Sequence, residues 1–127
     1  MPTLVTQSIR VSVRAEYLAD ASNPKSSHYL FAYHVNIANE GDEFVQLLSR
    51  HWIIKDAHDN VEEVRGDGVI GQQPLIAPGD AFPYTSACPL GTEWGIMRGT
   101  YLMARMDGEI FPVAVPAFAL LPPHLLN

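Results

Sequence analysis

The sequence predicts an all-β fold, an antiparallel β-sandwich, from three observations. Apolar and polar residues alternate along most of the chain, as they do in strands with one buried face. No apolar pattern with the longer repeat of a helix persists along the sequence. Segments rich in Gly, Pro, Asn and Asp separate the alternating runs. Short strands joined by such turns are typical of a sandwich.

The alternation is clearest from Ile9 to Tyr17 and resumes from Tyr29 after a loop that contains Pro24. The dipeptide Asp107-Gly108 is a strong signal for a β-hairpin. We expect strands over 9–17, 29–37, 44–55, 61–65, 81–87, 95–106 and 109–115, followed by a tail over 116–127. The apolar positions of these strands predict a core that includes Val11, Val13, Phe31, Tyr33, Val35 and Tyr101.

Composition restricts the class of protein. The chain has 127 residues, 47% of them hydrophobic and 17% charged, which suits a single globular domain over 1–127. A formal net charge of −6 with few, scattered basic residues argues against nucleic-acid binding. No apolar run is long enough to span a membrane. Cys88 has no cysteine to pair with and no secretory leader opens the chain, so we expect a cytoplasmic protein.

A GxGxxG string formed by Gly66, Gly68 and Gly71 is the most distinctive motif. Its dinucleotide-binding form requires a helix directly after the glycines. Here the residues 72–79 contain two prolines and a glycine, which forbid a helix. Two readings remain: a loop whose exposed amides bind a small anion, and a purely structural loop that needs positive φ angles.

The predicted strand over 44–55 mixes apolar and polar residues on both faces. If Trp52 fills the core, Arg50 shares its face and needs a carboxylate partner or a place at the end of the sandwich, because an unpaired buried charge is costly. If Trp52 points outward, Ser49 and His51 take the inner face instead. Either arrangement brings polar groups close to packed surface, as at a binding site, a subunit interface or a structural Arg pair.

The residues nominate no enzyme. The common nucleophile, zinc-protease and redox motifs are absent from the sequence. Cys88 precedes Pro89 and reads as a buried or loop thiol rather than a nucleophile. We therefore expect no catalytic residues and no cofactor.

The histidines do not predict a metal centre. His28 and His34 lie on one strand about 20 Å apart, which is too far for a shared ion. Asp56, His58 and Asp59 lie together in a predicted turn, where Asp is also favoured for backbone reasons. We therefore expect no metal site.

Several sequence blocks resemble the ApaG family, also called CorD. They are Asn39–Asp42, Leu47–Trp52, Val61–Val69, Gln73-Pro74, Leu75–Gly79 and Trp94–Tyr101, and the similarity runs from about residue 9 to residue 120. The resemblance implies an immunoglobulin or fibronectin type III-like sandwich. It also implies a cytoplasmic bacterial protein linked to cobalt resistance and magnesium efflux, and a domain that recurs in eukaryotic F-box and polymerase-interacting proteins. It supplies no catalytic residues, but it implies nucleotide or pyrophosphate binding as a candidate role for the glycine motif.

Two hypotheses from different classes follow. In the first, the chain is a non-enzymatic interaction or regulatory module that binds a protein partner through a sheet edge or a mixed face. In the second, it binds pyrophosphate or a nucleotide, and Asp67 would oppose that binding. The anion-binding candidates are Arg50, His51, Arg65, Gly66, Gly68 and Gly71. Because the mixed strands leave apolar surface uncovered, we also expect a homodimer.

Overall fold

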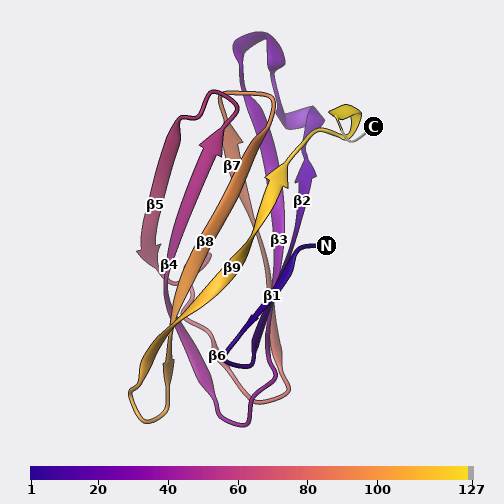
Figure 1. The fold of residues 1–127 in the computed structure, drawn as a ribbon. Helices are drawn as coiled ribbons and strands as arrows, with labels where there is room; N and C mark the ends of the chain where they lie inside the picture. Colours follow the sequence, from indigo (N-terminus) through magenta and orange to yellow (C-terminus); the bar gives the residue numbers. More distant parts are fainter. Residues whose placement is uncertain (126–127) are drawn as a thin grey trace.

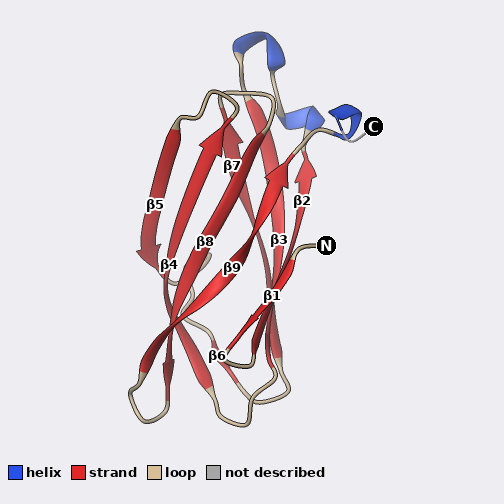
Figure 2. Cartoon of the chain, in the orientation of Figure 1, coloured by secondary structure: helices blue, strands red, loops and turns tan. Residues whose placement is uncertain are grey.

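The fold, in a computed structural model that describes residues 1–125, consists of two packed antiparallel sheets (Figures 1 and 2). One sheet has the strand order β1-β2-β3-β7 and the other β5-β4-β8-β9, with the short β6 also paired to β4. The strands are β1 (Thr3–Thr6), β2 (Ile9–Tyr17), β3 (Tyr29–Asn39), β4 (Val45–Asp56), β5 (Val61–Asp67), β6 (Leu75–Ile76), β7 (Ala81–Leu90), β8 (Gly95–Arg105) and β9 (Ile110–Leu120).

Short 3₁₀ turns make up the helical part of the described chain. They are η1 (Ala19–Ala21), η2 (Pro24–Ser26) and η3 (Pro123–Leu125). Within residues 1–125 no helix has the length and apolar character to cross a membrane.

The predicted all-β sandwich is confirmed, and each predicted strand is present. The prediction missed β1, whose side chains are largely exposed, and the two-residue β6, because neither shows an alternating burial pattern. The predicted tail was wrong over 116–120, where β9 continues to Leu120. Pro116 is tolerated because the pairing with β8 is irregular there, passing from Val115 directly to Phe118. Residues 126–127 of that predicted tail lie outside the described part.

Trp52 occupies the middle of the core and is only 2% exposed. Its indole meets the rings of Tyr33, Tyr101 and Phe118 edge-on, at centroid distances of 5.4, 6.0 and 6.1 Å. On β8 the indole lies against Gly99, where a Cβ would come within 2.7 Å of Trp52 Cε3. The ring therefore needs a glycine beneath it. The predicted core residues are all buried: Val11, Val13, Phe31, Tyr33, Val35 and Tyr101.

A β-bulge in β4 decides which side chains face the core. Leu47 pairs with Met103 and Ser49 with Leu102, so Leu48 has no partner on β8. This extra residue reverses the alternation, because an inserted residue shifts every later side chain to the other face. Leu47 before the bulge and Trp52 after it are consequently both buried. The alternative in which Trp52 points outward is excluded.

The hydroxyl groups of Tyr84 and Tyr101 hydrogen-bond to each other inside the core. Burial raises the pKa of both phenols. We expect Tyr84→Phe to lower the free energy of unfolding by about 1–3 kcal/mol, because the Tyr101 hydroxyl would lose its partner in an apolar site. The double change Tyr84→Phe with Tyr101→Phe should cost less than the sum of the two single changes, since no orphaned hydroxyl remains. Denaturant titration of the four proteins measures this coupling, and strictly additive costs would contradict it.

Candidate functional site

The GxGxxG segment forms a closed loop tied to the β4 bulge. The N–H of Gly68 donates to the carbonyl of Leu48 at 2.8 Å, and Val69 and Gln72 bond each other through both main-chain groups at 2.8 and 2.9 Å. Gln73 Nε2 donates to the same Leu48 carbonyl at 2.8 Å. The expectation that Gly68 exposes its amide was therefore wrong, because the bulge leaves a carbonyl that takes this N–H. The strand β6, not a helix, follows the loop.

A different structural reason explains why each position of the motif is a glycine. Gly68 and Gly71 have φ angles of 62° and 77°, in the left-handed region that glycine adopts most readily. A Cβ on Gly68 would also clash with the carbonyl oxygen of Gln72, whereas a Cβ on Gly71 would meet nothing within 4 Å. Gly66 lies in β5 opposite Arg50, and a Cβ there would come within 2.8 Å of Arg50 Nη1. The interpretation of the loop as purely structural thus accounts for all three glycines.

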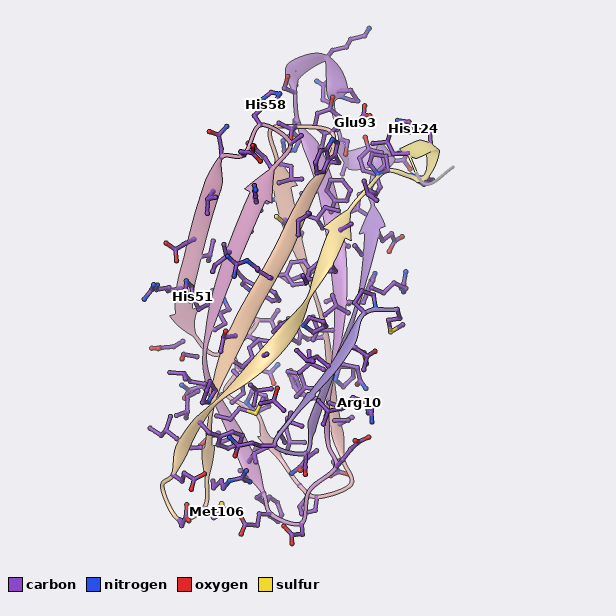
Figure 3. All side chains as sticks on the ribbon, viewed as in Figure 1. Arg10, His51, His58, Glu93, Met106 and His124 are labelled. Atoms are coloured by element: carbon purple, nitrogen blue, oxygen red, sulfur yellow. The ribbon has the colours of Figure 1, made fainter. Side chains whose placement is uncertain are left out.

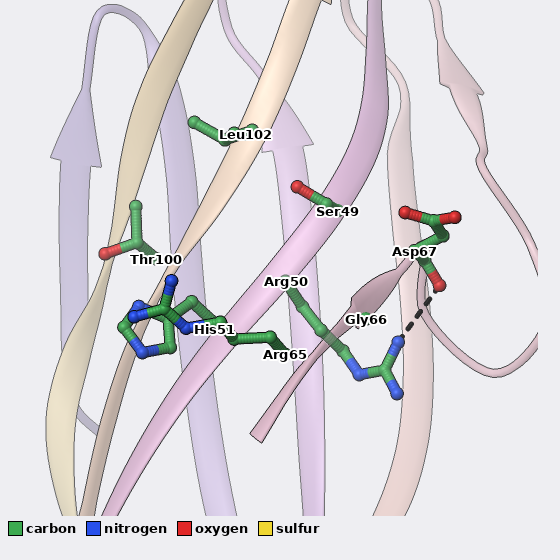
Figure 4. Close-up of a pocket in the computed structure, with 8 residues that line it drawn as sticks. All are labelled: Ser49, Arg50, His51, Arg65, Gly66, Asp67, Thr100 and Leu102. Atoms are coloured by element: carbon green, nitrogen blue, oxygen red, sulfur yellow. Dashed lines mark hydrogen bonds between the residues drawn. The ribbon is translucent and has the colours of Figure 1, made fainter. Parts of the chain in front are cut away.

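Arg50 shares the inner face of β4 with Trp52, as the alternation after the bulge requires. Its Nη1 donates to the carbonyls of Asp67 and Gly68, each at 3.0 Å; the bond to Asp67 is drawn in Figure 4. The carboxylate partner expected for a buried Arg50 is not found among residues 1–125. Instead, Arg50 donates to main-chain oxygens and lies half-buried at the side of the sandwich.

His51 and Arg65 lie on the opposite, outer face of the same sheet. They are paired across β4 and β5, as are Ser49 and Asp67. Thr100 and Leu102 of β8 adjoin them from the other side of β4. These strands border a groove of about 520 Å³ (Figure 4), lined by Ser49, Arg50, His51, Arg65, Gly66, Asp67, Thr100 and Leu102.

The basic groups of this groove are already close to a carboxylate. Glu63 Oε1 lies 2.8 Å from His51 Nε2 and 3.6 Å from Arg65 Nη2. The hydrogen bond from His51 lowers the pKa of Glu63, and the nearby Arg65 guanidinium lowers it further. Desolvation of the carboxylate opposes this shift. All three side chains are substantially exposed, so these pairs are weak. An anion entering the groove would compete with Glu63 for the His51 ring and the Arg65 guanidinium, and Asp67 adds a further negative charge.

The structure therefore divides the predicted anion-binding residues. His51 and Arg65 project into the outer groove, Arg50 extends along the inner face, and Gly66 lies between them. Gly68 and Gly71 do not line the groove. The sequence did not point to Glu63 or Thr100, or to Ser49 as their neighbour, because these proximities depend on strand register. The β4–β5 pairing brings Glu63 close, and the β4–β8 pairing brings Thr100 close. The charge of Glu63 beside Arg65 was the one available signal.

A second polar cluster lies on the outer face of the other sheet. His34 bonds Glu16 through Nε2 at 2.9 Å and Thr85 through Nδ1 at 2.8 Å, linking β2, β3 and β7. His34 and Thr85 sit in the middle of their strands and line a depression of about 370 Å³, whereas Glu16 lies near the end of β2. The arrangement joins a hydroxyl, an imidazole and a carboxylate in a row.

The last group of residues comprises the possible metal ligands and the thiol of Cys88. In the turn after β4, the Asp56 carboxylate accepts the N–H groups of His58 and Asn60. His51 lies along the sheet, whereas His58 and His124 lie at the end of the sandwich (Figure 3). Within the described chain no three His, Cys, Asp or Glu side chains are close enough to hold a metal ion. Burial, and secondarily the charge of Glu62, raises the pKa of the Cys88 thiol to about 11.

The different surroundings of two positive-φ glycines give a matched test of the loop. Gly68→Ala and Gly71→Ala both place a side chain in the left-handed region, at about 1–2 kcal/mol each. Gly68→Ala adds a clash with main chain, so its free energy of unfolding should fall further, by about 1–3 kcal/mol beyond Gly71→Ala. Chemical denaturation of both variants measures the difference. Equal losses would show that Gly68 is not held against the Gln72 carbonyl.

Comparison with known proteins agrees with this architecture. Residues 19–105 match the family model for the ApaG domain. The chain is 55% identical over 120 residues to Protein ApaG of Rhodospirillum centenum, covering 94% of this chain and 92% of that one. It is 51% identical over 124 residues to Protein ApaG of Paramagnetospirillum magneticum, covering 98% and 95%. A crystal structure of an ApaA protein from Bordetella pertussis superposes with a TM-score of 0.88 at 48% identity, covering 96% of each chain. The chain therefore belongs to the ApaG family.

Proposed function

We propose that this protein is a non-enzymatic interaction module whose docking element is the free edge of β5. The observation that carries the proposal is the contrast between β5 and the other edge strands. β7 contains Pro83 and Pro89, and β9 contains Pro112 and Pro116; proline removes the N–H groups that a new strand would need. β1 has only 4 residues. β5 has 7 residues, contains no proline and is largely exposed.

The partner chemistry of β5 follows from its charges. An antiparallel strand added at this edge would place its side chains opposite Glu63 and Arg65, which share the outer face. A matching partner carries an acidic residue opposite Arg65 and a basic residue opposite Glu63. β5 itself has this pattern: with a two-fold axis at Val64, Glu63 of one copy faces Arg65 of the other in both directions. A second copy of the chain is therefore the partner we assign to the edge.

Charge reversal tests this homodimer. Glu63→Arg, or Arg65→Glu, would set like charges directly opposite each other twice, and should weaken the dimer by about 1–4 kcal/mol. The double variant Glu63→Arg with Arg65→Glu restores opposite charges across the axis and should restore the dimer. Sedimentation at tens of micromolar distinguishes the dimer from the 14.0 kDa monomer.

The matched control is Asp42→Lys, which reverses an exposed charge in the turn before β4 and should leave the association unchanged. A monomeric unmodified protein would reject the proposed homodimer. Dimers that survive either single reversal would place the interface elsewhere.

On this proposal, the link to cobalt resistance and magnesium efflux that the resemblance implies would run through protein partners rather than through a metal bound by this chain. The Glu16, His34 and Thr85 row is the arrangement closest to catalytic geometry. It lies on a sheet face, and the helical elements of the described chain are three-residue 3₁₀ turns, too short to supply a helix dipole that would stabilise an oxyanion. Hydrolysis of an activated ester that Thr85→Val abolishes would overturn the non-enzymatic assignment.

The outer groove supports a second candidate, the binding of a small anion such as pyrophosphate. It brings Arg65 and His51 together beside Gly66 in one concave site. Of the groups predicted to contact the anion, the Arg65 guanidinium and the His51 ring line the groove. The Gly68 amide instead donates to the Leu48 carbonyl.

Calorimetry with pyrophosphate tests this second candidate. If it binds, Arg65→Ala should weaken binding by about 1–3 kcal/mol, the range for a hydrogen bond to a charged group. Asp67→Asn should strengthen it by removing an opposing charge. Gly71→Ala is the matched control, because Gly71 does not line the groove. No heat and no thermal stabilisation at millimolar pyrophosphate would leave the interaction module as the sole proposal.

A further inference from the structure

A separate cavity of about 200 Å³ lies between the two sheets on the side where β5 and β7 form the edges. Its polar side chains include Arg50 and Trp52 from β4 and Glu62 from β5. The rest of its lining includes the hydroxyl-bearing Tyr33 and Ser86 and apolar side chains such as Ile54, Val64 and Met97. The cavity is distinct from the outer groove, from which the β-sheet separates it, and none of the interactions described above fills it.

Trp52, one of the residues that line this cavity, carries an unused hydrogen-bond donor. Its Nε1 is buried and has no hydrogen-bond partner among residues 1–125. The Cε3 edge of the indole lies against Gly99 on β8. The Nε1 edge, on the other side of the ring, therefore faces away from β8. A buried N–H without an acceptor costs about 1–3 kcal/mol, so an acceptor supplied by a ligand would relieve that cost.

Arg50 adds a positive charge to the same cavity. Only its Nη1 bonds to main-chain carbonyls; its Nε and Nη2 form no hydrogen bond with the described residues. The guanidinium is held in place by those two carbonyls and by Gly66, so its remaining N–H groups are preorganised for an oxygen acceptor. In this half-buried site the attraction between the guanidinium and a charged acceptor is stronger than in water, and it acts against the cost of desolvating that acceptor.

We propose that this cavity binds the carboxylate of a small acid with a short apolar chain. The carboxylate oxygens would accept from Arg50 and from Trp52 Nε1–H, and the apolar chain would contact Ile54, Val64 and Met97. Glu62, an exposed member of the lining, disfavours a second negative charge and so selects a monocarboxylate over a dicarboxylate or pyrophosphate. The carboxylate could belong to a free acid or to an acidic side chain of an extended peptide, and the experiment separates these sources.

The Trp52 indole N–H is a direct reporter, because a hydrogen bond to it moves its proton resonance downfield. In ¹H–¹⁵N spectra the chain has two indole signals, and Trp94→Phe assigns the one from Trp52. Sodium butyrate at millimolar concentration should shift the Trp52 signal downfield in a saturable manner. Butyramide, which has the same shape without the charge, should shift it at least tenfold less at equal concentration.

Two variants distinguish this cavity from the outer groove. Arg50→Gln should abolish the butyrate-dependent shift, whereas Arg65→Gln, on the other face of the sheet, should leave it unchanged. The proposal is overturned if butyrate does not move the Trp52 signal, if butyramide moves it equally, or if the shift persists in a folded Arg50→Gln variant. Should Arg50→Gln fail to fold, the butyrate and butyramide comparison on the unmodified protein still decides.

A blocked tripeptide with a central Glu, compared with its Gln counterpart, identifies the source of the carboxylate. If the Glu peptide produces the same shift at lower concentration than butyrate, the site takes an acidic side chain. If only butyrate does so, the site takes a free acid. This readout is independent of the association state that tests the β5 edge, so either proposal can fail without the other.

Discussion

The β-bulge at Leu48 is the constraint on which the rest of this structure depends. It lets Leu47 and Trp52, five positions apart in the sequence, both enter the core, and it places Arg50 on the inner face and His51 on the outer one. It also leaves the Leu48 carbonyl without a partner on β8, and Gly68 and Gln73 donate to it. One extra residue thereby turns Arg50 and His51 to opposite faces of the sheet and anchors the glycine loop.

Two glycines then make room for the large side chains that the bulge turns inward. Gly99 lies beneath the Trp52 indole, and Gly66 lies beneath the Arg50 guanidinium. The glycine motif that resembles a nucleotide-binding string thus arises here from packing and from loop geometry. Its main-chain oxygens bind a cation of the protein itself, the Arg50 guanidinium, which is the opposite of an amide nest for an anion.

Much of the fold could be predicted from the sequence because alternation reports directly which face of a strand is buried. This worked for β2 and β3, where Val11, Val13 and Tyr33 are inside. Alternation failed to predict β1, whose side chains are largely exposed. It also failed for the end of β9, because Pro116 suggested that the strand ends there. The candidate site was less predictable. Arg65 became a candidate because it adjoins the motif, and His51 because it is a polar residue of the mixed strand. The place of Arg50 depends on the bulge, and the approach of Glu63 depends on the β4–β5 register, and no local pattern reveals either.

The most direct test of this account is hydrogen–deuterium exchange at the amides of the glycine loop. Gly68 N–H bonds to the Leu48 carbonyl, whereas Gly71 N–H has no main-chain acceptor among residues 1–125. We predict that Gly68 is strongly protected and that Gly71 exchanges at nearly the rate of an unstructured peptide. If Gly68 exchanges as fast as Gly71, the loop is not tied to the bulge, and the division of this sheet into an outer groove and an inner cavity would have to be abandoned.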